Sequence, residues 1–360
     1  MMKIYSLCNK HDKIFKVTDN YNVLSPRQKD KLLNVKCRID TVPTKEWEIS
    51  KKVLNQYEYI YTSSRTNKNI CGIIPVSRSY FKLYEILKDT IGIPSEGKAG
   101  CIAEGPGGFI HCLNDHSNII IHGITLISRI DRKIPYWNLQ IINNERNFLS
   151  YGIDGTGDIY KIENAEKYIN ETIKDKVFCD LVTADGGFDY SKDYNLQESA
   201  SYQLIYSEIY INLSIQKEGG TFIIKVFDLF DYKTIQLLYL LYISYDKILL
   251  HKPLTSRLSN SEKYVVCIGY NKYNGDLLDV LKEYYDHCGD LIIDVPDSFI
   301  NDIIKYNESF IDNQINTIND IIINIQSENK LRPSKKQIND AIQWCKSYDL
   351  PLNKKCIYKA

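Results

Sequence analysis

The sequence of 360 residues has no net charge, because 45 lysines and arginines balance 45 aspartates and glutamates. No overall field therefore draws the chain onto nucleic acid or a membrane, and any polyanion must be held by a local patch. Methionine, tryptophan and proline are scarce, whereas tyrosine, isoleucine, asparagine and lysine are abundant. This bias is typical of an AT-rich genome, such as that of a large DNA virus or an AT-rich protist, and carries no information about the fold.

Long hydrophobic runs are missing as well. The longest candidates, 234–245 (TIQLLYLLYISY) and 220–227 (GTFIIKVF), fall short of the ~18 apolar residues that a membrane-spanning helix needs. The first residues, MMKIYSLCNKHDK, lack the apolar core of a secretory signal. These absences predict a protein of the cytoplasm, in a viral factory or virion if the gene is viral, or of the nucleus if it is cellular.

Paired cysteine motifs are absent: the ten cysteines are scattered along the chain without a CxxC pair. This scatter predicts reduced, mostly buried thiols rather than a disulfide framework or a zinc knuckle. Cys101, His111, Cys112 and His116 lie close together in sequence, but their spacing fits no usual zinc template. We therefore expect no metal site.

The patterning that is present divides the chain into three parts. Residues 1–70 are polar with few clean periods, and we interpret them as an N-terminal extension. Residues 71–275 alternate between strand-like and helix-like stretches and form the predicted core. Residues 276–360 carry isoleucine-spaced helical patterns, the last of which Ser334 could cap, and are predicted to form a C-terminal helical appendix.

The core part predicts an α/β fold. A helical recurrence over 77–92 ends at Gly92, and further helices are predicted at 195–220 and 234–243. Short apolar stretches predict strands at 100–104, 119–127, 177–185, 220–228, 244–253 and 263–270. Such alternation favours a mostly parallel sheet sandwiched between helices. Ligands of these sheets bind beyond the C-terminal ends of the strands.

Acidic and basic residues are predicted at the ends of four of these elements. Lys82 lies on the first helix, Asp185 ends one strand, Lys225 ends another and Glu262 opens a third. Each alone is more commonly a solvated surface charge. Lys225 differs because it interrupts the apolar strand GTFIIKVF, and burying an ammonium costs enough that it should be paired or useful. Two lysines and two carboxylates could therefore converge at the strand tips, close to the glycine-rich turn AEGPGGF at 103–109.

Together these features resemble the FtsJ-like ribose 2′-O-methyltransferases, whose Lys-Asp-Lys-Glu tetrad has this chain order. The resemblance is closer still to the messenger-RNA cap 1 ribose methyltransferases of eukaryotes and large DNA viruses. It rests on eight blocks in order: EGPGGF (104–109), GITL (123–126), DGTGDI (154–159), ADGGF (184–188), NLQE (195–198), GGTFIIKVFDLF (219–230), YLLY (239–242) and KPLTSRLSNSEKYVVCIGY (252–270). The first 60 residues match nothing in that family.

The resemblance implies a doubly wound Rossmann-like sheet with helices on both faces, and S-adenosylmethionine as cofactor. Gly105, Gly107 and Gly108 would let the methionine arm approach the backbone closely. Asp154 resembles the acid near the adenosine, whereas Asp158 could instead cap a helix at Ile159. The ribose-binding acid usual at the end of the second strand is absent from GITLIS. The implied cofactor-binding residues are Glu104, Gly105, Pro106, Gly107, Gly108, Phe109, Asp154 and Asp185.

For the reaction, the resemblance implies that Lys225 steers and deprotonates the ribose hydroxyl. Lys225 can act as a base only if its pKa is depressed, and we expect burial and the nearby Lys82 to depress it. Asp185 and Glu262 would hold the two lysine heads in position. No metal is required, because the sulfonium of the methyl donor is already a strong electrophile.

The RNA contacts implied by the resemblance lie beside Glu262. Arg257, Ser259 and Asn260 would contact RNA phosphates or the cap-proximal nucleotide, and Arg65 and Arg78 are further candidates. A surface ion pair is the alternative for each arginine. No aromatic residue is assigned to stacking on the cap guanine, since 28 tyrosines and 11 phenylalanines offer no basis for choosing one.

The leading hypothesis is a methyltransferase that converts cap 0 to cap 1 on messenger RNA, with capped mRNA and other capping or transcription proteins as partners and no membrane. A ribose methyltransferase for ribosomal or transfer RNA is the nearest alternative. A non-catalytic RNA-binding subunit of a capping complex is the alternative from another class. A nicotinamide-dependent oxidoreductase is disfavoured, because the acid that its ribose contact needs after the second strand is missing.

Overall fold

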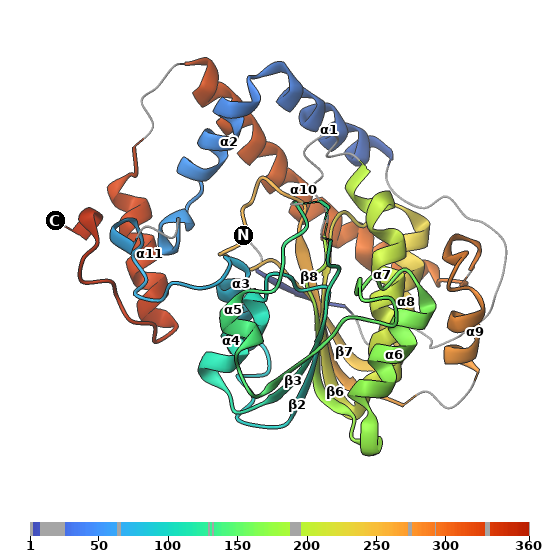
Figure 1. The fold of residues 1–360 in the computed structure, drawn as a ribbon. Coiled ribbons are helices and arrows are strands. Elements are labelled where there is room, and N and C mark those ends of the chain that lie inside the picture. The colour runs from blue at the N-terminus through green and yellow to red at the C-terminus, as the bar shows by residue number, and fades with distance from the viewer. Residues whose placement is uncertain are drawn as a thin grey trace.

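A central sheet organises the computed structural model, which describes residues 3–7, 26–62, 66–128, 130–131, 133–187, 196–272, 276–291, 293–327 and 332–359. Within these ranges eight strands pair in the order β1-β7-β8-β6-β5-β2-β3-β4 (Figure 1). Their bounds are β1 Ile4–Ser6, β2 Lys98–Ile102, β3 Ile120–Ile124, β4 Asn147–Ser150, β5 Cys179–Ala184, β6 Gln216–Val226, β7 Tyr245–His251 and β8 Lys263–Tyr270. Strands β2 to β6 are mutually parallel, whereas β8 runs antiparallel to β6 and β7. The mixed α/β fold with a largely parallel centre is therefore confirmed.

Helices cover both faces of the sheet. One layer contains α3 (Ser79–Asp89), α4 (Gly108–His116) and the short α5 (Leu139–Ile142), and the other contains α6 (Ile162–Thr172), α7 (Gln197–Ile215) and α8 (Tyr232–Ser244) (Figure 1). Neighbouring strand residues such as Ile223 and Ile224 are both fully buried, but they belong to different core clusters on opposite faces. Burial on both faces explains why the central strands are apolar throughout instead of alternating.

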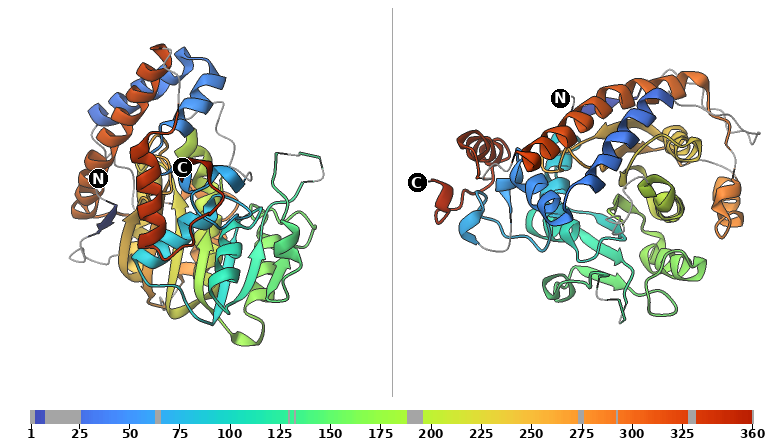
Figure 2. Two further views of the ribbon diagram at one scale, coloured as in Figure 1. Left: turned by 90° about the vertical axis from the view of Figure 1, so that its left-hand side faces the viewer. Right: turned by 90° about the horizontal axis from the view of Figure 1, so that it is seen from above.

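The beginning and the end of the described chain pack together in space. Helices α1 (Pro26–Cys37) and α2 (Thr44–Val53) lie against the long α10 (Asp297–Gln326), above one edge of the sheet (Figures 1 and 2). A separate apolar cluster that includes Leu32, Trp47 and Ile318 holds them there. Strand β1 extends the sheet by pairing antiparallel with β7. The division into three parts remains a prediction, but its first and last parts are neighbours.

The C-terminal region is helical, as predicted. Helix α9 (Leu277–Glu283) precedes α10, and α11 (Lys335–Ser347) follows it. Ser334 caps α11 in a capping box with Gln337, which confirms the expected helix start. Short 3-10 helices complete the described chain: η1 Arg38–Thr41, η2 Glu58–Ile60, η3 Thr66–Lys68, η4 Lys174–Lys176, η6 Cys288–Asp290 and η7 Ile357–Lys359.

Several sequence-based boundaries differ from the structure by a few residues. The helix predicted for 195–220 ends at Ile215, because Gln216 already pairs with Cys179 in the sheet and its side-chain amide donates to the Cys179 carbonyl at 2.8 Å. The strand predicted for 119–127 ends at Ile124. No helix in the described ranges is both long enough and apolar enough to span a membrane.

Candidate active site

The four predicted catalytic residues meet at the C-terminal ends of the parallel strands. Asp185 directly follows β5, Lys225 is the penultimate residue of β6, and Glu262 directly precedes β8. The antiparallel register pairs Lys225 with Tyr264, so that Glu262 emerges at the same edge as the tip of β6. Lys82 reaches this edge from α3. The arrangement follows from topology, because the carboxyl ends of parallel strands share one edge of a sheet.

Two ion pairs connect these residues. The Lys82 ammonium lies 2.7 Å from Oε1 and 2.8 Å from Oε2 of Glu262. Lys225 Nζ donates to the Asp185 backbone carbonyl at 2.7 Å and lies 3.2 Å from the Asp185 carboxylate. Tyr264 donates its hydroxyl to the same carboxylate at 2.9 Å. The buried lysine in β6 is therefore paired, as the cost of an isolated buried charge requires.

The expectation of a depressed pKa for Lys225 is wrong. Burial acts to lower the pKa of Lys225, but Asp185 and Glu262 outweigh burial and raise it. Lys82 cannot depress it as expected, because its charge is neutralised by Glu262. For Glu262, burial would raise the pKa, yet Lys82, Lys225 and Lys252 hold it below its usual value. These directions keep Lys225 as an ammonium and Glu262 as a carboxylate.

Lys252 is a buried residue of this site that sequence reasoning missed. Its ammonium donates to the Asn260 carbonyl at 3.0 Å, to Asn260 Oδ1 at 2.6 Å and to the Glu262 carbonyl. Burial pushes the pKa of Lys252 well below its usual value. The available signal was a lysine at the end of an apolar stretch, here KILLHK, as for Lys225 in TFIIK.

The loop 252–262, which leads into β8, is held by side chains along its length. Glu85, one turn after Lys82 on α3, accepts hydrogen bonds from the backbone N–H groups of Leu254 and Thr255 at 2.7 and 3.0 Å. Ser256 donates to Glu262 Oε1 at 2.8 Å. These bonds fix the direction in which Glu262 faces Lys82.

The glycine-rich turn connects β2 to α4 beside these residues. Gly107 is the N-cap of α4 with φ +104°, a conformation that favours glycine, and a Cβ there would lie 2.7 Å from Ile141. Pro106 accepts a backbone hydrogen bond from Asn138 at 3.1 Å. A Cβ on Gly105 would lie 2.7 Å from the Pro135 carbonyl, and one on Gly108 would lie 2.0 Å from Ser79 Oγ. The packing around the turn therefore requires glycine at these three positions, whether or not a ligand binds there.

Glu104 and Phe109 flank that turn. Phe109 is 1% exposed, and its ring centroid lies 5.9 Å from that of Tyr264. Phe109 therefore belongs to the core next to the site. Glu104 is also buried and accepts a hydrogen bond from the Thr183 hydroxyl through Oε1, while its Oε2 has no partner among the described residues. Burial, together with Asp185 and Glu208, raises the pKa of Glu104 well above its usual value. A buried carboxyl with an unused oxygen fits a cationic ligand that brings N–H donors.

Asp154 organises its own loop. It accepts hydrogen bonds from the Thr156 N–H at 2.9 Å and hydroxyl at 2.6 Å, and it pairs with Lys161 at 2.7 Å. These bonds, that from Lys161 first, lower the pKa of Asp154. The alternative for Asp158, a helix cap at Ile159, does not occur: α6 begins at Ile162, and Asp158 accepts from the Tyr160 N–H at 3.0 Å.

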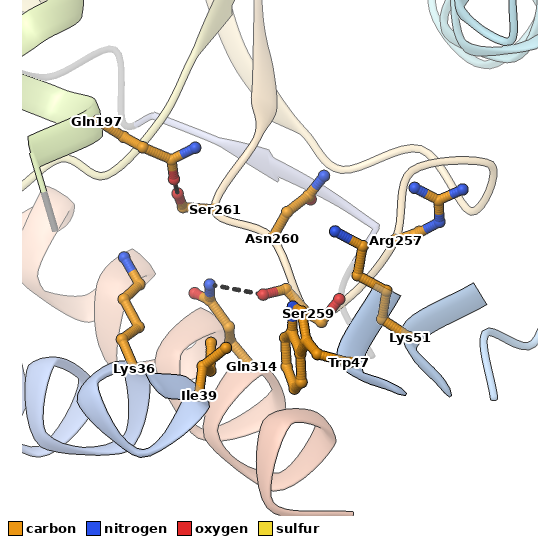
Figure 3. A pocket seen from close by; sticks show the side chains of 10 residues that line it. All are labelled: Lys36, Ile39, Trp47, Lys51, Gln197, Arg257, Ser259, Asn260, Ser261 and Gln314. Carbon is orange, nitrogen blue, oxygen red and sulfur yellow. Dashed lines mark hydrogen bonds between the residues drawn. The ribbon is translucent and has the colours of Figure 1, made fainter. Parts of the chain in front are cut away.

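The predicted RNA contacts divide into three groups. Arg65 lies outside the described residues. Arg78 and Arg257 both pair with Glu58, at 3.2 and 2.7 Å. Ser259 and Asn260 line a pocket, where Ser259 accepts a hydrogen bond from Gln314 through its carbonyl at 3.3 Å (Figure 3). Their contacts with RNA stay a prediction.

That pocket, which we call the loop pocket, lies between loop 252–262 and the N- and C-terminal helices. Trp47 and Lys51 enter it from α2, Gln314 from α10 and Gln197 from the start of α7 (Figure 3). Gln314 is 1% exposed, and its Oε1 has no hydrogen-bond partner within the described chain. Sequence reasoning missed the contribution of residues 1–70, because only tertiary packing brings α2 to this loop.

Across the described ranges, no three histidine, cysteine, aspartate or glutamate side chains are grouped to hold a metal ion. The candidate His111 is engaged otherwise: its Nδ1 accepts from the Val76 N–H at 3.1 Å, and its Nε2 lies 2.8 Å from the Gln140 amide.

Comparison with known proteins decides the family. Residues 75–270, more than half of the chain, match the profile of the FtsJ-like methyltransferases. The chain belongs to this family. The matched range contains all four residues of the two ion pairs and the glycine-rich turn. FtsJ-like family membership confirms the resemblance drawn from the eight sequence blocks.

Individual relatives of known name are also similar to this chain. A Trypanosoma cruzi protein named cap-specific mRNA (nucleoside-2′-O-)-methyltransferase 1 is 32% identical over 227 residues, covering 59% of this chain and 60% of its own. The Homo sapiens protein of the same name is 31% identical over 262 residues, covering 69% of this chain and 31% of its own. The chain thus spans between about a third and three fifths of these relatives. A Plasmodium falciparum structure described as a ribosomal RNA methyltransferase is 20% identical, covers 54% of this chain and 97% of its own, and has a TM-score of 0.40.

A second group of buried charged residues lies around the loop that follows β6. Lys36 pairs with Asp228 at 2.6 Å, and Lys263 donates to the Phe227 carbonyl at 2.5 Å. Glu198, at the start of α7, accepts the backbone N–H groups of Phe230 and Asp231 at 2.8 and 2.9 Å, both through Oε1. Burial, with Asp231 and Asp228, raises the pKa of Glu198 to about 7. Glu198 therefore holds the loop after β6 in either protonation state.

We predict that Glu198 makes stability depend on pH between about 4.5 and 7. Because its folded-state pKa is raised, the stabilisation it contributes is complete below pH 4.5 and is lost as pH rises through 7. Glu198→Gln keeps an oxygen for both N–H groups but cannot ionise. Between pH 4.5 and 8, urea unfolding should therefore show the original protein losing about 3 kcal/mol relative to this variant.

Glu163→Gln on the exposed side of α6 is the matched control, because it removes a carboxylate that is not buried. A stability difference between Glu198→Gln and the original protein that stays constant over this pH range would contradict the prediction.

Proposed function

We propose that this protein transfers a methyl group from S-adenosylmethionine to the ribose 2′-O of the first transcribed nucleotide of capped mRNA. The observation that carries the proposal is the convergence of Lys82–Glu262 and Lys225–Asp185 at the strand tips of an FtsJ-like fold. The names of the curated relatives, which specify the cap and the 2′-oxygen, support the choice of substrate.

The residues at the end of β2 fit the methyl donor. S-adenosylmethionine would supply a methyl group on a sulfonium, so it is cationic and also carries an ammonium. Glu104 offers to N–H donors a buried oxygen that has no partner in the part of the chain that the structure describes. The turn 105–108 contains three glycines, which leave its backbone open to close approach. Asp185 lies next to this turn, between it and Lys225. Asp154, engaged by its own loop, is proposed to face the adenosine.

Lys225 is proposed to orient the acceptor hydroxyl. As an ammonium held by Asp185, it donates a hydrogen bond and fixes the direction of the ribose oxygen. In the reaction the oxygen forms a bond to the methyl carbon, the carbon–sulfur bond breaks, and the hydroxyl proton must leave. Lys225 can accept that proton only after losing its own, and a cationic methyl donor nearby would favour this loss, because like charges lower the pKa of an ammonium.

The loop pocket is proposed to receive a base from the cap-proximal part of the RNA. Ser261, the residue before Glu262, lines this pocket, which supports the assignment. The basic residues of the pocket already have acidic partners, namely Lys36 with Asp228, Lys51 with Glu48 and Arg257 with Glu58. Its other lining side chains include the Trp47 ring, which is 4% exposed, and amides such as Gln314, whose Oε1 has no hydrogen-bond partner among the described residues. Aromatic surface and hydrogen-bonding edges suit a base better than a phosphate.

Methyl transfer to RNA of one sequence, capped and uncapped, tests the substrate. We expect transfer to the capped RNA with the methyl group mapped to the 2′-oxygen of the first transcribed nucleotide. Equal rates on both RNAs would contradict cap specificity, and a preference for folded ribosomal or transfer RNA would favour the alternative substrate. Cofactor binding without any transfer would point to a non-catalytic subunit.

Substituting Lys225 tests the mechanism. Lys225→Met should lower kcat by about 100-fold or more, because a positioned proton-transfer group contributes about 10²–10⁴-fold. Calorimetry should show that binding of S-adenosylmethionine is retained. Lys217→Met, at the exposed opposite end of β6, is the control. A Lys225→Met protein that binds the cofactor and keeps full activity would refute the assigned role.

Substituting Gln314 tests the loop pocket. Gln314→Met keeps the length of the side chain but removes the Oε1 acceptor, together with the amide that donates to the Ser259 carbonyl. It should weaken binding of capped RNA by about 5–10-fold, the value of one hydrogen bond. The kcat should stay unchanged, since the contact is the same in ground and transition states. Gln326→Met on the exposed end of α10 is the control. Unchanged binding by Gln314→Met would exclude the loop pocket as a base site.

A further inference from the structure

One buried carboxylate joins the segments that carry Lys82 and Glu262. Glu58, in η2 of the N-terminal part, is 3% exposed. It accepts two hydrogen bonds from Arg257, from Nε at 3.0 Å and from Nη2 at 2.7 Å, which is the bidentate geometry of strong arginine–carboxylate pairs. Nη1 of Arg78 lies 3.2 Å from the same carboxylate, and the Asn55 amide donates to it at 3.1 Å.

The two arginines stand at the entrances to the catalytic elements. Arg78 is the N-cap residue of α3, one turn before Lys82, and it also donates to the Tyr61 carbonyl at 2.8 Å and the Thr255 carbonyl at 3.0 Å. Arg257 lies in the loop 252–262, five residues before Glu262. The cluster therefore connects η2, the start of α3 and the loop that delivers Glu262.

Solvent barely reaches the Glu58 side chain, which is 4% exposed, whereas the side chains of Arg78 and Arg257 are 20% and 24% exposed. Burial would raise the pKa of Glu58, but Arg78 and Arg257 lower it below its usual value, so the carboxylate stays ionised. Without the Glu58 carboxylate, the guanidinium groups of Arg78 and Arg257 would lose the negative charge that they share. Removing one member of a buried ion cluster leaves an uncompensated charge, which is strongly unfavourable. The contact between the start of α3 and the loop 252–262 would then rest on the Arg78–Thr255 bond and the bonds that Glu85 accepts.

We propose that Glu58 is a positioning residue, which sets the Lys82–Glu262 pair through Arg78 and Arg257. The inference rests on the proposed function. It also gives the two arginines a different role from the RNA phosphate contacts expected from sequence, since the Nε–Nη2 fork of Arg257 and the Nη1 of Arg78 are directed at Glu58. A 1 Å misplacement of a catalytic group can cost about 100-fold in rate, so a cluster outside the site can control the reaction.

The test uses Glu58→Gln, Arg257→Gln and the double variant in the full chain. We expect each single variant to lower kcat on capped RNA by about 10–100-fold and to leave KM for that RNA within about twofold. The double variant should be no slower than either single variant, because all three disrupt one cluster. Glu46→Gln, an exposed glutamate of the same N-terminal part, is the control.

Two further readouts separate positioning from RNA contact and from general loss of structure. The salt dependence of RNA binding should be unchanged in Arg257→Gln, whereas loss of a phosphate contact would reduce its slope by about one. Amide hydrogen exchange at Leu254 and Thr255 should accelerate at least about tenfold in Glu58→Gln while the central strands stay protected. The exchange measurement needs no substrate, so it tests the cluster even if the protein transfers no methyl group. Absence of methyl transfer would count against the proposed function alone.

An unchanged kcat together with unchanged exchange in folded Glu58→Gln would overturn the proposal. A reduced salt slope in Arg257→Gln, with kcat retained, would overturn it in favour of RNA contact. Should Glu58→Gln fail to fold, Arg257→Gln, which leaves the Arg78–Glu58 pair in place, is subject to the same criteria.

Discussion

A buried ammonium at the tip of a central strand has to be compensated, and this requirement organises the whole site. Lys225 is compensated by the carbonyl and the carboxylate of Asp185 on the neighbouring parallel strand. Asp185 is held in turn by Tyr264, whose position opposite Lys225 is set by the antiparallel register of β6 and β8. Each partner comes from a different strand, so the pairing exists only when the sheet has its native order.

The same principle extends outward from the strand tips. Lys82 neutralises Glu262, Lys252 holds the loop that delivers Glu262, and Glu58 compensates the two arginines at the entrances to α3 and that loop. Charged groups lie at the centre of this part of the protein because they compensate one another in a connected series. The arrangement resembles a preorganised polar environment, in which the cost of orienting charges is met during folding and not during the reaction.

Several features of this site can be predicted from the sequence, and the reasons are local. A lysine inside an apolar strand, acids at strand ends and a glycine-rich turn are visible in the order of residues. They mark Lys82, Asp185, Lys225 and Glu262 as candidates, and the family resemblance supplies their predicted roles. The protonation of Lys225 cannot be predicted in this way, because the balance of charges depends on distances. From sequence, the nearby Lys82 is expected to lower the pKa of Lys225. In the structure, Lys82 is paired with Glu262. Lys252 is easily missed, although it carries the same signal, because a polar stretch follows it.

The sequence by itself determined the fold class, six strands and three helices of the core, and the family, because apolar periodicity and short motifs are properties of neighbouring residues. It missed β4, α4, α5 and α6. Only the tertiary structure decided which residues far apart in the chain share a pocket or a charge. Residues 1–70 show no pattern of their own, yet Trp47 and Glu58 reach the loop before Glu262, and Gln314 joins them from α10. Such contacts arise from packing across nearly the whole chain, and no local pattern records them.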